Sequence, residues 1–122
     1  MLDTKTVNSL RSLGEDFLCE LISIYLRDVP GMLSQMEAAI LDGDNKSGSM
    51  AAHSLKGSSY SLGIRSVGDI CDTLEDDFDE GVLENVTEKM QQLKNEQLQA
   101  EAELKHLQKQ LMRFMQVQPK EI

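Results

Sequence analysis

The stretch Ala51-Ala52-His53-Ser54-Leu55-Lys56-Gly57-Ser58-Ser59-Tyr60-Ser61-Leu62-Gly63 has its apolar and polar residues at helical spacing. At about 100° per residue, one side of a helix carries Ala51, Leu55, Ser58 and Leu62. The opposite side carries His53, Lys56, Gly57 and Tyr60. The pattern predicts an amphipathic helix whose imidazole points to water, beside an ammonium group and a missing side chain. A core histidine would lie on the apolar side, so this one is interpreted as presented to a partner.

Amphipathic helices are expected on both sides of this segment. Apolar residues recur at steps of three and four from Phe17 to Ile40, and the stripe stays in phase across Pro30, which favours one kinked helix. A short helix, capped by Asp3 or Thr4 and reaching Leu13, is expected before it. Asn45 or Ser47 is expected to cap the His53 helix and Gly63 to end it. A fourth helix starts near Ser66 and ends in the acidic segment 75–81.

The last predicted helix carries a heptad-like seam, weakened at its centre. Its members are Val86, Met90, Leu93, Gln97, Ala100, Leu104, Leu107, Leu111 and Phe114. At ~1.5 Å per residue, residues 83–115 span roughly 50 Å, about twice the length of the His53 helix. The overhanging seam either pairs with a second copy of the chain or packs on the first helix and the Pro30 helix. The sequence leaves both alternatives open.

The composition favours an all-α fold. Of the 122 residues, 40% are hydrophobic and only 4% aromatic, and leucine, methionine and alanine, all good helix formers, dominate the apolar set. We expect an antiparallel four-helix bundle with a short N-terminal helix and a long C-terminal helix. Residues 1–122 are interpreted as a single domain, with a bundle core at about 10–95 and a last helix reaching about 115.

The charge and the termini limit the function classes. A net charge of −9 argues against nucleic-acid binding and against adsorption to anionic lipid. The acidity either serves solubility or steers the chain toward a partner with a basic rim. No signal peptide is expected from the first residues, and no apolar stretch approaches membrane-spanning length. Cys19 and Cys71 lie in apolar stripes and are expected to be reduced and buried, so a cytoplasmic location is expected.

The chemistry available at His53 is nucleophilic. A surface imidazole is partly neutral at cellular pH and forms covalent intermediates through a ring nitrogen. Lys56, one turn on, is placed to meet phosphoryl oxygens, and Gly57 gives a partner clearance at a cost in helix stability. No glycine-rich phosphate loop or zinc-ligand spacing is present, so no nucleotide or metal site is expected. His106, away from the seam, and the carboxylates of 75–80, expected in a solvated turn, are interpreted as spectators.

The segment 53–59 together with Leu62-Gly63 and Cys71-Asp72-Thr73-Leu74-Glu75 resembles the signature of histidine-containing phosphotransfer (HPt) domains. Upstream, 14–18 and 39–44 also resemble this family, and the match covers about 10–81. The acidic segment 75–80 and the long last helix depart from the common pattern of the family.

The resemblance implies a phosphorelay protein. His53 would accept a phosphoryl group from, and donate it to, the aspartate of a response-regulator receiver domain, with a hybrid histidine kinase upstream. The chain would be a phosphocarrier, not an enzyme, with no cofactor of its own and Mg²⁺ on the receiver. Lys56 would stabilise the phosphoryl group, and Gly57 would admit the receiver. The residues expected to contact the partner are Ser54, Ser58, Tyr60 and Glu75, with Glu75 next to the imidazole.

Two other interpretations are kept. In one, the chain is a non-phosphorylated helical adaptor or inhibitor that binds a receiver or a kinase, with the last helix forming a homodimer. In the other, it is a phosphotransfer domain excised from a larger hybrid kinase.

Overall fold

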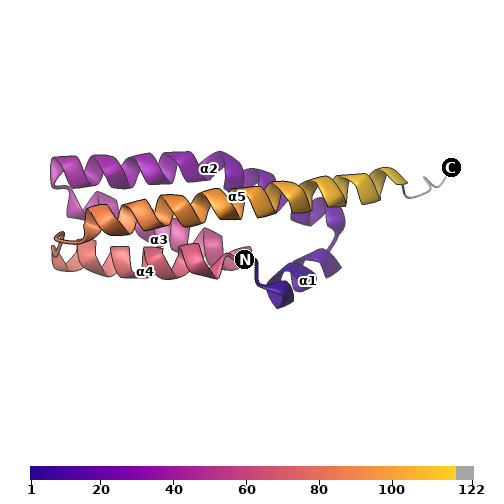
Figure 1. The fold of residues 1–122 in the computed structure, drawn as a ribbon, viewed down its shortest axis with the longest axis horizontal. Helices are drawn as coiled ribbons and strands as arrows, with labels where there is room; N and C mark the ends of the chain where they lie inside the picture. Colours follow the sequence, from indigo (N-terminus) through magenta and orange to yellow (C-terminus); the bar gives the residue numbers. More distant parts are fainter. Residues whose placement is uncertain (118–122) are drawn as a thin grey trace.

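The computed structural model describes residues 1–117. It has the helices α1 (Thr4–Ser12), α2 (Glu15–Asp42), α3 (Asn45–Ser61), α4 (Arg65–Glu80) and α5 (Val86–Val117), and no strand within the described range. Helices α2 to α5 run antiparallel to their neighbours in a bundle, and α1 lies at one end of it (Figure 1). The prediction of an all-α four-helix bundle with a short first and a long last helix is confirmed.

The bundle closes because each long helix buries one apolar side. Helix α3 packs on α2 and α4, and α5 closes the bundle by packing on the other side of the same two helices. The largest fully buried side chains include Phe78, Leu18, Ile22, Met36, Leu55, Ile64, Leu74, Leu93, Leu104 and Leu111. Burial of such side chains is the dominant stabilising contribution in a bundle of this kind. It leaves the outward side of α3 in solvent.

Pro30 lies inside α2 without ending the helix. Val29 and Met36, before and after it, are both fully buried, so the apolar stripe continues across the proline. A proline removes one backbone hydrogen bond, and here its ring lies on the exposed side of the helix. The prediction that one helix, rather than two, passes through Pro30 is confirmed.

The helix ends differ from the sequence expectations in detail. The cap of α3 is Asp44, whose Oδ1 accepts a hydrogen bond from the Ser47 backbone N–H at 3.1 Å. The prediction that Asn45 or Ser47 is the cap was therefore wrong. Helix α1 ends at Ser12 instead of Leu13. Gly63 does end α3, with φ of +78°. The Asp3 N–H donates to the Gly63 carbonyl at 2.8 Å and holds the start of the chain against the α3–α4 turn.

The seam of α5 is covered within the chain. Every seam residue from Val86 to Leu104 is buried, and so is Leu111. The start of α2 lies along the distal half of α5, where Gln108 Nε2 donates to the Cys19 carbonyl at 3.1 Å. The Leu2 N–H, just before α1, donates to Glu103 at 2.9 Å. Of the two alternatives for the overhang, packing within the chain is therefore the one observed, on α2 and on the residues just before α1, and the seam needs no second copy as far as Leu111.

No helix within residues 1–117 combines the length and the apolar character needed to cross a membrane.

Two glycines that the sequence analysis did not single out let α3 and α4 approach closely. A Cβ at Gly48 would overlap the ring of Phe78, and a Cβ at Gly68 would overlap the ring of Tyr60. Gly48 is on α3 and Gly68 on α4, so each helix contributes one glycine and one aromatic ring. The close approach brings the polar side chains of the two helices within reach of each other.

Replacing Gly48 by alanine should lower the free energy of unfolding by about 1–3 kcal/mol, because the ring of Phe78 is buried and cannot move aside without strain. The matched control is Gly57→Ala on the same helix, where a Cβ meets nothing within 4 Å. There the substitution should raise stability by about 0.5–1 kcal/mol, the difference in helix propensity. Urea unfolding of both variants measures this. Equal effects at the two glycines would contradict the packing described.

Candidate functional site

His53 lies on the solvent side of α3. Its side chain is 68% exposed, whereas Ala51, Ala52 and Leu55 are at most 2% exposed. The helix is therefore oriented by its apolar residues, and the imidazole points away from the core as the periodicity predicts.

Helix α4 supplies the direct partner of the imidazole. Oε2 of Glu75 lies 3.0 Å from Nδ1 of His53. The Glu75 side chain is only 18% exposed, because it lies between the two helices. Because a carboxylate only accepts hydrogen bonds, a neutral ring in this contact carries its proton on Nδ1, and Nε2 is then its unprotonated nitrogen.

The same carboxylate also contacts Lys56. Oε1 of Glu75 is 2.7 Å from Nζ of Lys56, and Oδ1 of Asp72 is 3.3 Å from the same nitrogen. Hydrogen bonds that the Lys56 ammonium donates to the carboxylates of Glu75 and Asp72, with Glu75 the larger cause, raise the pKa of Lys56 above its ordinary value. The ammonium is therefore held against α4, not extended freely into solvent beside His53.

Gly57 leaves open space on the surface of α3 next to His53. It is exposed, and a Cβ there would meet no atom within 4 Å. Nothing within the described chain therefore requires a glycine at this helical position.

The other sequence-predicted contact residues differ in their surroundings. Ser54 is exposed, and Ser58 is half-buried toward α2. Tyr60 is 40% exposed, but its hydroxyl donates to Asp69 at 2.6 Å and its ring lies over Gly68. That hydrogen bond raises the pKa of Tyr60 to about 12. Tyr60 thus links α3 to α4, besides offering one side of its ring to solvent.

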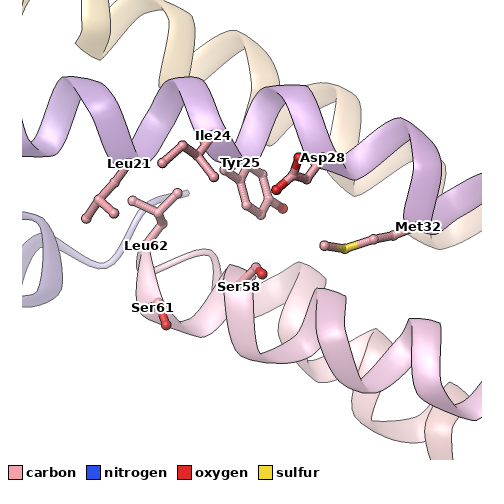
Figure 2. A pocket seen from close by; sticks show the side chains of 8 residues that line it. All are labelled: Leu21, Ile24, Tyr25, Asp28, Met32, Ser58, Ser61 and Leu62. Atoms are coloured by element: carbon pink, nitrogen blue, oxygen red, sulfur yellow. The ribbon is translucent and has the colours of Figure 1, made fainter.

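A shallow pocket of about 190 Å³ opens between α2 and α3 (Figure 2). Figure 2 shows apolar side chains from both helices, with Ser58 and Ser61 on α3 and Asp28 next to Tyr25 on α2. Its lining residues are Leu21, Ile24, Tyr25, Asp28, Met32, Ser58, Ser61 and Leu62. Of these residues only Ser58 was a predicted contact residue, because a pocket shared by two helices leaves no mark in the periodicity of either one.

Ser59 is not part of the exposed side of α3. It is fully buried, and its hydroxyl lies 3.0 Å from the Tyr25 hydroxyl. Tyr25 in turn donates to Oε1 of Gln97 at 2.8 Å. Burial raises the pKa of Tyr25 to about 12. Gln97 does not simply weaken the seam of α5; it closes a polar contact joining three helices.

The conformation of the acidic segment 75–80 also differs from the one predicted from the sequence. Residues 75–80 do not form a solvated turn; they are the last turns of α4. Besides Glu75, Asp77 pairs with Lys89 of α5, and Asp79 accepts a hydrogen bond from Ser49 of α3. Several of these carboxylates therefore fasten α4 to its neighbours instead of standing free in solvent.

The comparisons with known proteins agree with this geometry. The family model described as "Hpt domain" matches residues 20–113. Histidine-containing phosphotransfer protein B (HptB) from Pseudomonas aeruginosa PAO1 is similar in structure, with a TM-score of 0.86 and 26% identity over 89% of this chain and 95% of that one. Histidine-containing phosphotransfer protein MtHPt2 from Medicago truncatula gives a TM-score of 0.73 and 28% identity over 94% and 79%. A search of curated proteins found no significant match.

The chain therefore belongs to the Hpt domain family. Its function is histidine phosphotransfer in a phosphorelay, as a phosphocarrier that works with response-regulator receivers.

The two tyrosines should both ionise near pH 12 in the folded protein, above the ordinary value of 10. Because the folded state holds these protons more tightly, stability is fully present below pH 10 and falls as the pH rises toward 12. An ultraviolet absorbance titration measures the ionisation. Asp69→Asn should lower the pKa of Tyr60 alone. In Tyr60→Phe the remaining absorbance change belongs to Tyr25. An unshifted titration in Asp69→Asn would contradict the assigned hydrogen bond.

Proposed function

We propose that Nε2 of His53 is the atom that accepts and donates the phosphoryl group. The observation that carries the proposal is the 3.0 Å contact between Nδ1 and Glu75, which leaves the opposite ring nitrogen unprotonated on an imidazole 68% exposed. The nucleophile thus faces solvent, where a partner can reach it.

The transfer balances without a further proton donor. The lone pair of Nε2 attacks phosphorus, the P–O bond of the partner's aspartyl phosphate breaks, and the aspartate leaves as a carboxylate. The ring keeps its Nδ1 proton and becomes a phosphorylated imidazolium. Glu75 accepts a hydrogen bond from that N–H and offsets the positive charge. In the return direction the P–N bond breaks and the ring leaves as neutral imidazole that keeps its Nδ1 proton, so one contact supports both directions.

Lys56 and Gly57 complete the site. The Lys56 ammonium, one turn from His53, is near enough to meet phosphoryl oxygens as a point charge when the group arrives. The open space above Gly57 admits the partner's surface. Positioning and charge neutralisation are the main requirements of phosphoryl transfer, and these residues supply both.

The rest of the chemistry belongs to the partner. We assign to the receiver domain the reactive aspartate and the Mg²⁺, and we infer no nucleotide site in this chain. The receiver would contact Ser54, Ser58 and Tyr60 around His53. A hybrid histidine kinase is the expected source of phosphate, and the free thiols Cys19 and Cys71 agree with a cytoplasmic location. A homodimer through α5 stays a prediction, and the adaptor interpretation has no separate observation in its favour.

His53→Gln should abolish phosphorylation, because the side chain loses its nucleophilic nitrogen. The measurement uses phosphoramidate and a panel of receiver domains loaded with acetyl phosphate, with phosphate on the chain read by intact mass. The matched control is His106→Gln, at the other histidine, which is exposed on α5. It should be labelled like the unchanged protein. Labelling of His53→Gln, or its loss in His106→Gln, would contradict the assignment.

Glu75→Gln should slow labelling by phosphoramidate by about tenfold, because a charge-assisted hydrogen bond to the developing imidazolium becomes a neutral one. The shape of the side chain and its burial are kept, so the thermal unfolding temperature serves as the control for folding. A labelling rate equal to that of the unchanged protein would show that Glu75 does not support the charge of the ring.

A further inference from the structure

Two carboxylates, Glu75 and Asp72, contact the Lys56 ammonium, but only Glu75 also orients His53. Glu75 already contacts both Nδ1 of His53 and Nζ of Lys56. Asp72, one helical turn earlier on α4, adds a second carboxylate 3.3 Å from the same ammonium. Within residues 1–117 this is the only ion pair that Asp72 makes.

The charge balance changes when a phosphoryl group is added. With a neutral imidazole, Lys56, Asp72 and Glu75 together carry one net negative charge. A phosphoryl group places nearly two negative charges on its oxygens at neutral pH and leaves about one positive charge on the imidazolium ring. The Lys56 ammonium is then shared between the phosphoryl group and two carboxylates. An ion pair between Lys56 and Asp72 therefore weakens the interaction of Lys56 with the phosphoryl oxygens.

Other groups near this position are engaged elsewhere or point to solvent. Asp69, one turn before Asp72, accepts the hydroxyl of Tyr60. Asp76, one turn after Asp72, is exposed, and no ion pair within the described chain involves it. Asp72 is therefore the carboxylate, besides Glu75, that is placed to compete for Lys56.

We propose that Asp72 is a positioning residue that draws the Lys56 ammonium toward α4 and so raises the phosphoryl-transfer potential of phosphorylated His53. The inference rests on the proposed function of His53 and concerns the energy of its phosphorylated state. Asp72 acts through Lys56 and by direct repulsion of the phosphoryl group. Its presence favours donation of the group over its retention.

Asp72 can have this effect without supporting the fold. Its side chain is 56% exposed, whereas Lys56 is 23% and Glu75 is 18% exposed. Removing its charge leaves every buried contact between α3 and α4 in place. Because the site faces solvent, the effect should be moderate and sensitive to salt.

The test compares Asp72→Asn with Asp76→Asn, which makes the same charge change one turn further along α4. Each protein is brought to equilibrium with phosphoramidate at a fixed ratio to ammonia. In this reaction the P–N bond of phosphoramidate breaks, ammonia leaves, and a bond from Nε2 to phosphorus forms. The fraction of phosphorylated His53 is measured by phosphorus NMR.

Asp72→Asn should shift this equilibrium toward phosphorylated His53 by about threefold to tenfold at low ionic strength. Most of the shift should disappear near 1 M salt, where the Debye length is about 3 Å. Asp76→Asn should shift it by less than half as much. A purely structural change would not fade with salt, so an effect that is insensitive to salt, equal in the two variants or absent from Asp72→Asn would overturn the proposal.

The outcome is independent of whether any receiver partner has been found. If phosphoramidate labels His53 but no receiver does, the relay assignment fails while the Asp72 comparison can still be measured. If receivers exchange phosphate with His53 and Asp72→Asn leaves the equilibrium unchanged, only the role of Asp72 is wrong.

Discussion

The site depends on one carboxylate that contacts two side chains of the neighbouring helix. Glu75 on α4 contacts Nδ1 of His53 with one oxygen and Nζ of Lys56 with the other. It can do so because α3 and α4 pack closely enough for a half-buried glutamate to reach across. Gly48 under Phe78 and Gly68 under Tyr60 permit that approach. The orientation of the imidazole is thus a consequence of how two helices pack.

The remainder of the fold holds these two helices in place. Helices α2 and α5 close the bundle on its other side, and the buried contact of Tyr25, Ser59 and Gln97 joins α2, α3 and α5. Leaving the Tyr25 hydroxyl and Oε1 of Gln97 buried without partners would be costly, so this contact disfavours other alignments of α5 along the bundle. Because α5 is long and its seam is repetitive, such a fixed point restricts its register more than the apolar residues alone would.

The sequence predicted the class of fold and the exposed face of α3, because both follow from the spacing of apolar residues in single helices. His53 and Gly57 lie where the pattern places them, and the long α2 continues past Pro30 as expected. The pattern failed where a contact joins two helices. It did not show that Ser59 is buried against Tyr25, that Asp72 reaches Lys56, or that Gly48 and Gly68 are packing positions. It also indicated a turn at the carboxylates of 75–80, because their density resembles a loop while their contacts with α3 and α5 join residues far apart in the sequence.

The central claim is that Glu75 fixes the Nδ1 proton and leaves Nε2 to take the phosphoryl group. It is tested most directly by NMR of the phosphorylated protein with labelled imidazole nitrogens, which identifies the nitrogen bonded to phosphorus. The account predicts that phosphorus is coupled to Nε2 of His53 while Nδ1 still carries its proton. A phosphoryl group on Nδ1 would contradict it, because that nitrogen would then have to leave the carboxylate of Glu75.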